Sequence, residues 1–173
     1  MAFHNQYREG RKASPYSQKE LGVLIGTTQS NISKYENGDR PIPDDLVIKT
    51  LKILKNPRLK IAYEVEKQSS IINIPLLNNV DENEVVILDV LIEEAEEAIA
   101  SANELKRLIR NRKSREEFSL SEWDRFMEYE EQIADLFPAL KLHFVVMAER
   151  FGLDLDRLSM RLNAKYKSKN YLL

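Results

Sequence analysis

Apolar residues recur at alternating steps of three and four through much of the second half of the chain. The row comprises Val85, Leu88, Ile92, Ala95, Ile99, Ala102 and Ile109, with Lys106 as its one polar interruption, and Leu91, Ala98 and Leu105 widen it. This spacing places apolar side chains on one face of an α-helix. Because Asp81 and Glu84 have the spacing of a capping box, we expect a helix from Asp81 to about Arg112.

A second apolar stripe follows after a short break. It comprises Trp123, Phe126, Met127, Ile133, Phe137, Leu140, Phe144, Ala148 and Phe151. Ser119 and Glu122 form another capping box at its start. An internal proline removes a backbone hydrogen bond, so Pro138 predicts a kink or two abutting helices. With a last helix from Asp154 to about residue 167, the second half is expected to be a long helical hairpin or bundle.

The first 68 residues carry the turn signals of short helices instead. These signals stand at Ser14-Pro15, Gly26, Asn37-Gly38 and Arg40-Pro41-Ile42-Pro43. Ser17 and Glu20 form a capping box, and Thr28 can cap a helix from Gln29 to about Glu36. Acidic residues at positions 44 and 45 suit the first turn of a further helix. Four or five helices fit before residue 68, and we expect five. Because both halves of the chain carry helical signals, the expected fold class is all-α.

Residues 69–81 have no helical period and contain Pro75, so they are expected to form an extended linker. The segment is apolar for a linker, with Ile71, Ile72, Ile74, Leu76 and Leu77. Exposing these side chains together would be costly, and we therefore expect the linker to dock on a helical surface. The predicted domains are residues 1–68, a docked linker over residues 69–81, and residues 82–173.

Composition excludes several classes of function. The chain has no cysteine, which removes disulfides, thiolate metal sites and cysteine nucleophiles. Only two histidines are present, of which His4 lies near a terminus expected to be mobile and His143 is expected to be a surface or core residue. No Gly-rich phosphate motif, membrane-spanning run or secretory signal is found, so we expect a cytoplasmic protein.

The net charge of −2 is unevenly distributed. Residues 1–60 contain 11 lysines and arginines against 6 acidic residues, a net charge of +5, whereas the remainder carries −7. A polyanion such as DNA would be attracted to the first part and repelled by most of the rest. This asymmetry favours a nucleic-acid-binding module joined to a part with another task.

The first segment contains a set of residues with characteristic order and spacing. They are Ser17-Gln18, Leu21, Gly26, Thr27-Thr28-Gln29, Ile32-Ser33, Tyr35-Glu36 and Gly38. In these residues the chain resembles the helix-turn-helix domain of the xenobiotic response element (Xre) family, which includes the lambdoid phage repressors and Cro. The resemblance covers about residues 5–57, and its one noted departure is Gly22, where the family usually has alanine. It implies a lambda-repressor-like domain that binds DNA.

The resemblance also implies roles for individual residues. Gln29, Ser30 and Lys34 match positions that touch bases. Gln18, Asn37 and Arg40 match or neighbour positions that touch phosphates, and Arg11 is expected to pair with Glu36 as a structural ion pair.

The residues themselves support the same interpretation. Leu21, Leu24, Ile25, Ile32 and Tyr35 are expected to bury the inner faces of two crossing helices. The outward residues would then be Gln29, Ser30, Asn31, Ser33 and Lys34, with Thr28 at the start of the helix. Side chains of these polar types can hydrogen-bond base edges in the major groove.

The acidic residues of the second half suggest an alternative. Glu94 and Glu97 have the E-x-x-E spacing of all-helical magnesium-dependent nucleotide pyrophosphatases, but Glu131 and Asp135 do not supply the matching E-x-x-D. A solvated helix face is the favoured interpretation, so we expect no enzyme activity, no cofactor and no metal site. The basic residues at positions 106–115 are expected to complement the carboxyl end of the long helix.

Together these patterns predict a sequence-specific double-stranded DNA-binding transcriptional regulator, a bacterial or phage repressor that binds its operator as a homodimer. Two half-sites require two reading helices, and the long hairpin has more apolar surface than it can bury alone. Ile92, Ile99, Phe137 and Phe144 are the expected dimerisation residues. The alternatives are a protein-binding adaptor or antirepressor built on the same scaffold, and the helical hydrolase.

Overall fold

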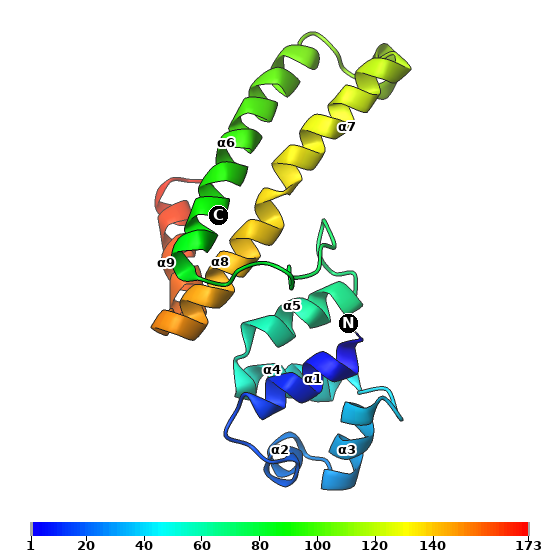
Figure 1. Cartoon of the computed structure of the whole chain (residues 1–173), viewed down its shortest axis with the longest axis vertical. Coiled ribbons are helices and arrows are strands. Elements are labelled where there is room, and N and C mark those ends of the chain that lie inside the picture. Colours follow the sequence, from blue (N-terminus) through cyan, green and yellow to red (C-terminus); the bar gives the residue numbers. More distant parts are fainter. Residues whose placement is uncertain (1, 173) are drawn as a thin grey trace. The chain divides into compact units, whose positions relative to one another are not determined.

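The computed structural model describes residues 2–172, and the regular structure within that range is helical, without strands (Figure 1). The chain divides into two compact units, residues 1–76 and 77–173. This division falls inside the segment that the sequence predicts as a linker. Ile71 in that segment is fully exposed, which contradicts the expectation of burial for this residue. Docking of the linker as a whole stays a prediction.

The first unit consists of five short helices, as expected. They are α1 (Phe3–Lys12), α2 (Gln18–Ile25), α3 (Gln29–Asn37), α4 (Asp44–Leu54) and α5 (Pro57–Glu66). Local sequence sets their ends: Ser17 and Glu20 form the predicted capping box of α2, and the Thr28 side chain accepts a hydrogen bond from the Asn31 backbone N–H at the start of α3. Gly26 and Gly38 end α2 and α3 in the left-handed conformation, which glycine adopts without steric cost.

The core of the first unit lies where these helices meet. It comprises Tyr7, Leu21, Ile25, Ile32, Tyr35, Leu46 and Leu59. The prediction that Leu24 is part of this core is wrong, because its side chain is 51% exposed. Helix α2 packs on α3 and α4, and Leu21 and Ile25, four residues apart, occupy that contact. Leu24 is at the edge of the contact and Val23 lies outside it.

The second unit contains the predicted hairpin and terminal helix. Its elements are α6 (Glu84–Leu108), the 3-10 turn η1 (Arg115–Glu117), α7 (Leu120–Ala134), α8 (Leu136–Phe151) and α9 (Leu155–Ser168). Helix α6 packs along both α7 and α8 (Figure 1). Helices α7 and α8 abut at Asp135, which confirms one of the two outcomes expected from Pro138. Pro138 lies in the first turn of α8, where a helix does not need its N–H.

The bounds of α6 differ from the prediction at both ends. The helix begins at Glu84 instead of Asp81, because the Asn83 side chain accepts hydrogen bonds from the Val85 and Val86 N–H groups and caps the helix. Asp81 accepts a hydrogen bond from the Asn83 N–H one step earlier, so it lies outside the helix. The carboxyl end is at Leu108, before most of the basic residues that were expected to complement it.

Helix α6 buries only one edge of the predicted apolar stripe. Its buried residues are Ile87, Ala98 and Leu105, of which Ala98 and Leu105 were expected to widen the stripe and Ile87 was not expected in it. The buried residues of α8 are Pro138, Ala139, Leu142, Val145 and Val146. The row from Val85 to Ile109 lies beside this contact and is largely exposed. Two apolar rows therefore run along one helix, and only one of them is covered within the unit.

No helix among residues 2–172 combines the length and the apolar character that crossing a membrane would require.

Candidate nucleic-acid interface

Helix α3 is held against α2 by a tight turn. Gly26 has φ of +82°, and the Thr27 N–H donates to the Gly22 carbonyl oxygen at 2.7 Å. Gly22 is buried, and a Cβ atom there would lie 3.0 Å from the Thr27 carbonyl oxygen. The departure from the family's usual alanine therefore occurs where α2 lies directly against the backbone of the turn that leads into α3. An alanine at this position would require the turn to move by a few tenths of an ångström.

The outer face of α3 carries most of the predicted base-reading residues. Gln29, Ser30 and Lys34 are exposed, and so are Asn37, the last residue of the helix, and Arg40 just beyond it. Thr28 is also exposed, while its hydroxyl caps the helix. Glutamine can pair with adenine, and lysine can donate to guanine, in the major groove. Because α3 is short and bounded by two left-handed glycine turns, this face stands at the surface of the unit.

Asn31 and Ser33 are less accessible than the sequence analysis expected. Both are half-buried, and the Asn31 side-chain amide donates to the Thr27 hydroxyl at 3.0 Å. That hydrogen bond joins the first turn of α3 to the preceding turn. Asn31 therefore helps to position the helix. The predicted base-reading side chains that remain exposed are Gln29, Ser30 and Lys34.

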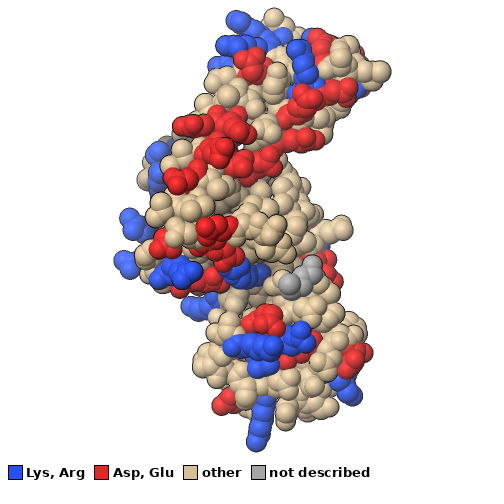
Figure 2. Space-filling model, in the orientation of Figure 1, with Lys and Arg blue, Asp and Glu red and all other residues tan. Residues whose placement is uncertain are grey.

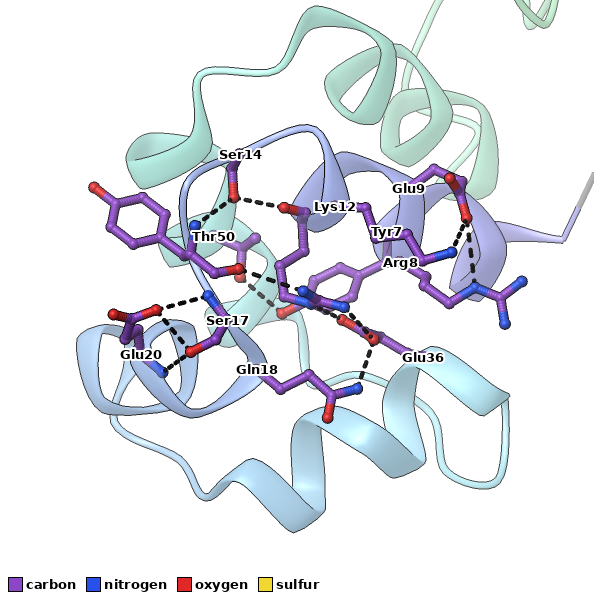
Figure 3. A network of polar contacts seen from close by, with 12 residues as sticks. Tyr7, Arg8, Glu9, Lys12, Ser14, Ser17, Gln18, Glu20, Glu36 and Thr50 are labelled. Atoms are coloured by element: carbon purple, nitrogen blue, oxygen red, sulfur yellow. Dashed lines mark hydrogen bonds and ion pairs between the residues drawn. The ribbon is translucent and has the colours of Figure 1, made fainter.

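A buried carboxylate organises the inner side of the motif (Figure 3). Glu36 is 1% exposed, and both of its oxygens accept hydrogen bonds from the Arg11 guanidinium, through Nε to Oε1 and through Nη2 to Oε2 at 3.0 Å. Hydrogen bonding to Glu36 raises the pKa of Arg11 above its ordinary value, while burial acts in the opposite direction. The ion pair that the family resemblance implies is therefore present and joins α1 to α3.

Gln18 belongs to the same network. Its side-chain amide donates to Glu36 Oε2 at 2.8 Å (Figure 3). An amide nitrogen carries two hydrogens, so one remains for an outside acceptor such as a phosphate. Gln18 can therefore contact a phosphate only from a position that Glu36 sets.

His4 was set aside in the sequence analysis as part of a mobile terminus, and the structure corrects this. His4 lies in α1 and is half-buried. A Cβ atom on Gly38 would come within 3.0 Å of its imidazole ring, so the ring packs directly on the turn that ends α3. The glycine signalled a close approach, but no local pattern indicated that the approaching residue was thirty-four positions away.

The carboxylates of the second unit do not form a metal centre within the described residues. No group of three or more His, Cys, Asp and Glu side chains in residues 2–172 is placed to hold an ion. Glu94 is half-buried, and its pKa is raised by burial first and then by the charges of Asp135, Glu97 and Glu93. This is the environment of a partly shielded carboxylate among other negative charges.

The predicted dimerisation residues are mostly accessible. Ile92, Ile99 and Phe137 are exposed, and Phe144 is half-buried with its ring edge-on to His143 at 5.2 Å. Three of the four side chains are therefore available to a partner.

Comparison with known families agrees with the geometry of the first unit. Residues 8–60 match the family model described as Helix-turn-helix, and this range spans α2, α3 and α4 together with the second half of α1 and part of α5. The comparisons with curated proteins and with solved structures found no match.

Proposed function

Starting from a helix-turn-helix DNA-binding domain at residues 8–60, we propose that this chain is a transcriptional regulator that binds a specific double-stranded operator as a homodimer. Helix α3 enters the major groove, and Gln29, Ser30 and Lys34 read base edges there. Gln18, Asn37 and Arg40 contact the flanking phosphates. The observation that carries the proposal is the exposed polar face of α3, held between two glycine turns and anchored from behind by Glu36.

Charge supports the same assignment. Residues 1–60 carry a net charge of +5, and the remainder of the chain is acidic. A duplex is therefore drawn to the first unit and kept from lying along the second. For a DNA-binding protein of this kind, the cytoplasm of a bacterial cell is the expected place of action.

The second unit supplies the dimer in this proposal. One helix-turn-helix domain reads one half-site, and a pair reads two half-sites about one helical turn, or about 34 Å, apart. Exposed Ile92, Ile99 and Phe137 provide apolar surface for self-association. The simplest mode of action for such a dimer is repression by occupancy of the operator.

Selection of bound sequences from a pool of randomised duplexes tests this function. We expect enrichment of a two-part site, with binding that weakens steeply as salt is raised because phosphate contacts release counterions. Full-length Gln29→Ala is the matched variant, and it should lose the enrichment at a few base pairs of each half-site. Absence of any salt-dependent duplex binding would favour the adaptor or antirepressor alternative.

A further inference from the structure

The feature that carries a further inference is the exposed apolar row along α6, here called the outer row, which includes two of the residues assigned to self-association. It comprises Val85, Leu88, Ile92, Ala95, Ile99, Ala102 and, directly after the helix end, Ile109. The five large side chains of the row are between 41% and 63% exposed. Apart from one interruption at Lys106, the row keeps the seven-residue spacing that packs one helix against another. Scattered exposed leucines need no explanation, but a periodic row does.

The sizes of the side chains along the outer row suit an antiparallel partner. A twofold axis near Glu97 would place Ile92 opposite the partner's Ala102, and Ile99 opposite the partner's Ala95. Large side chains would then face small ones throughout the centre, which lets two helices keep an even spacing. A parallel arrangement would instead set isoleucine on isoleucine and alanine on alanine, and would bring Lys106 against itself.

The charges beside the outer row agree with this direction. The amino-terminal half of α6 carries Asp89, Glu93 and Glu96, and basic residues follow at 106, 107 and 110. Figure 2 shows acidic residues over the middle of the second unit and basic residues gathered toward the tip of the hairpin. Antiparallel helices place the acidic half of one against the basic end of the other, whereas parallel helices align like charges.

We propose that the outer row is the interface with a second copy of this chain, and that the α6 helices of the two copies pack antiparallel about a twofold axis near Glu97. The inference deepens the proposed function, because it supplies the surface and the direction of the homodimer. The row lies beside the α7 and α8 contact rather than in it, so pairing requires no rearrangement of the hairpin. Flanking charge pairs then form between Asp89 and the partner's Arg107, which lie nearly level with one another, on both sides of the axis.

Cysteine cross-linking of the full-length chain tests the direction, since the protein has no cysteine of its own. Ile92→Cys and Ala102→Cys alter exposed positions, and circular dichroism checks that each variant keeps its helicity. In the antiparallel dimer these positions lie level with one another. Two copies of Ile92 are then separated by about 15 Å along the axis, beyond the reach of a disulfide. Mixed oxidation should give the heterodimer, and neither variant alone should cross-link.

The matched control uses Glu104→Cys in place of Ala102→Cys. Glu104 is two residues further along α6 but lies on the opposite face, so this variant should not cross-link to Ile92→Cys. Self-cross-linking of Ile92→Cys alone would show a parallel pair and overturn the proposal. If the protein sediments as a dimer but the mixed cross-link does not form, the outer row is not the dimer interface. A monomer would overturn this inference and the dimeric part of the proposed function, while duplex binding by the first unit is measured separately.

Charge reversal gives an independent readout by sedimentation. Asp89→Lys and Arg107→Asp should each weaken self-association about three- to tenfold, because each change acts twice in a twofold interface. The double variant should return to within about twofold of the original chain. Glu97→Lys makes the same change in charge on the opposite face of α6 and should have little effect. Failure of the double variant to recover would contradict the pairing of these two positions.

Discussion

At the scale of single residues, the first unit separates side chains that hold the motif from side chains that face outward. Glu36, Arg11 and Gln18 form one network inside, and Gln29 and Lys34 stand outside it. Changes in the two groups should therefore have different consequences. The inner group should affect stability, and the outer group should affect the choice of DNA sequence.

Gln29→Ala and Lys34→Ala should each weaken specific DNA binding by about 1 to 3 kcal/mol, the typical worth of a bidentate base contact. The melting temperature should hardly change, because both side chains are exposed. Titration of operator and random duplex at one salt concentration measures the effect. Lys52→Ala, which removes an equal charge from α4, is the control. Equal losses on both duplexes would show that these residues do not read bases.

Glu36→Ala should destabilise the protein by about 3 to 5 kcal/mol, because it leaves the partly buried Arg11 without its partner. Thermal unfolding measures this. Glu9→Ala is the matched control, since its ion pairs with Arg8 and Lys12 are solvent-exposed and contribute little. An unchanged melting temperature in Glu36→Ala would reject a structural role for the pair.

At the scale of elements, residues that follow α6 at the tip of the hairpin contact the residues at the start of α7. Arg112 pairs with Glu122 and lies over the Phe118 ring at 4.5 Å. Arg115 lies over the Trp123 ring at 4.3 Å, and that ring stacks on Phe126. These basic residues therefore contact the residues at the start of α7. The expectation that they interact with the carboxyl end of α6 is wrong for Arg112 and Arg115.

Glu122 makes the capping of α7 sensitive to pH. Hydrogen bonds from the Ser119 backbone, the Arg112 guanidinium and the Ser119 hydroxyl lower its pKa to about 2. Because the folded-state pKa lies below the unfolded value of about 4.3, this stabilisation is complete above that value and is lost as the pH falls toward 2. The melting temperature of Glu122→Gln should therefore depend less on pH between about 4.3 and 2. Equal slopes in the two proteins would contradict this.

The helix ends could be predicted from the sequence wherever a local pattern sets them. Ser17, Thr28 and Ser119 cap the helices that they were expected to cap, because a cap requires only residues three or four positions apart. The prediction for Asp81 was wrong because Asn83, two residues further along, accepts hydrogen bonds from the Val85 and Val86 N–H groups and caps the helix. A local sequence pattern does not show which of two neighbouring residues will cap the helix.

The buried face of α6 was predicted only in part, for a different reason. Ala98 and Leu105 belong to the predicted stripe, whereas Ile87 was missed. Two apolar rows run side by side along the helix, and Ile87 and Leu88 belong to different rows although they are neighbours. Which of the two rows is covered depends on how α7 and α8 pack against α6, and the sequence of α6 alone does not contain this information. The exposed polar face of α3 was predictable, because Leu21, Ile25 and Ile32 identify the inner side. The inward hydrogen bond of Asn31 was not.

At the scale of the whole molecule, two units with separate cores permit separate tasks. The first unit has its own buried cluster around Tyr7 and Leu59, and the second has one built from α6 and α8. The division of the chain near residue 76 therefore allows each to be tested without the other.

A chain ending at Gln68 should be a folded monomer that binds one half-site weakly. It retains all five helices of the first unit and lacks the hairpin. Analytical ultracentrifugation at micromolar concentration and duplex titration check both properties. Sedimentation of this shortened chain as a dimer would show that self-association does not depend on residues 82–173.

Ile99→Glu should split the full-length dimer and keep its helicity. Ile99 is 63% exposed, so the charge meets solvent in the monomer and an apolar surface only in the dimer. Burial of such a side chain contributes about 1.5 to 3 kcal/mol, and a twofold interface contains it twice. Sedimentation and circular dichroism on one sample measure both effects. Loss of helicity would show instead that Ile99 is needed inside the hairpin.

The packing of His4 on Gly38 has a practical consequence for handling the protein. Ala2, Phe3 and His4 line a hollow together with Gly38 and Arg40, so the amino end of α1 adjoins the turn that closes the helix-turn-helix motif. A purification tag or fluorescent fusion attached at that end would project beside groups assigned to the phosphate backbone. A polyhistidine or lysine-rich tag there would add its own affinity for nucleic acid.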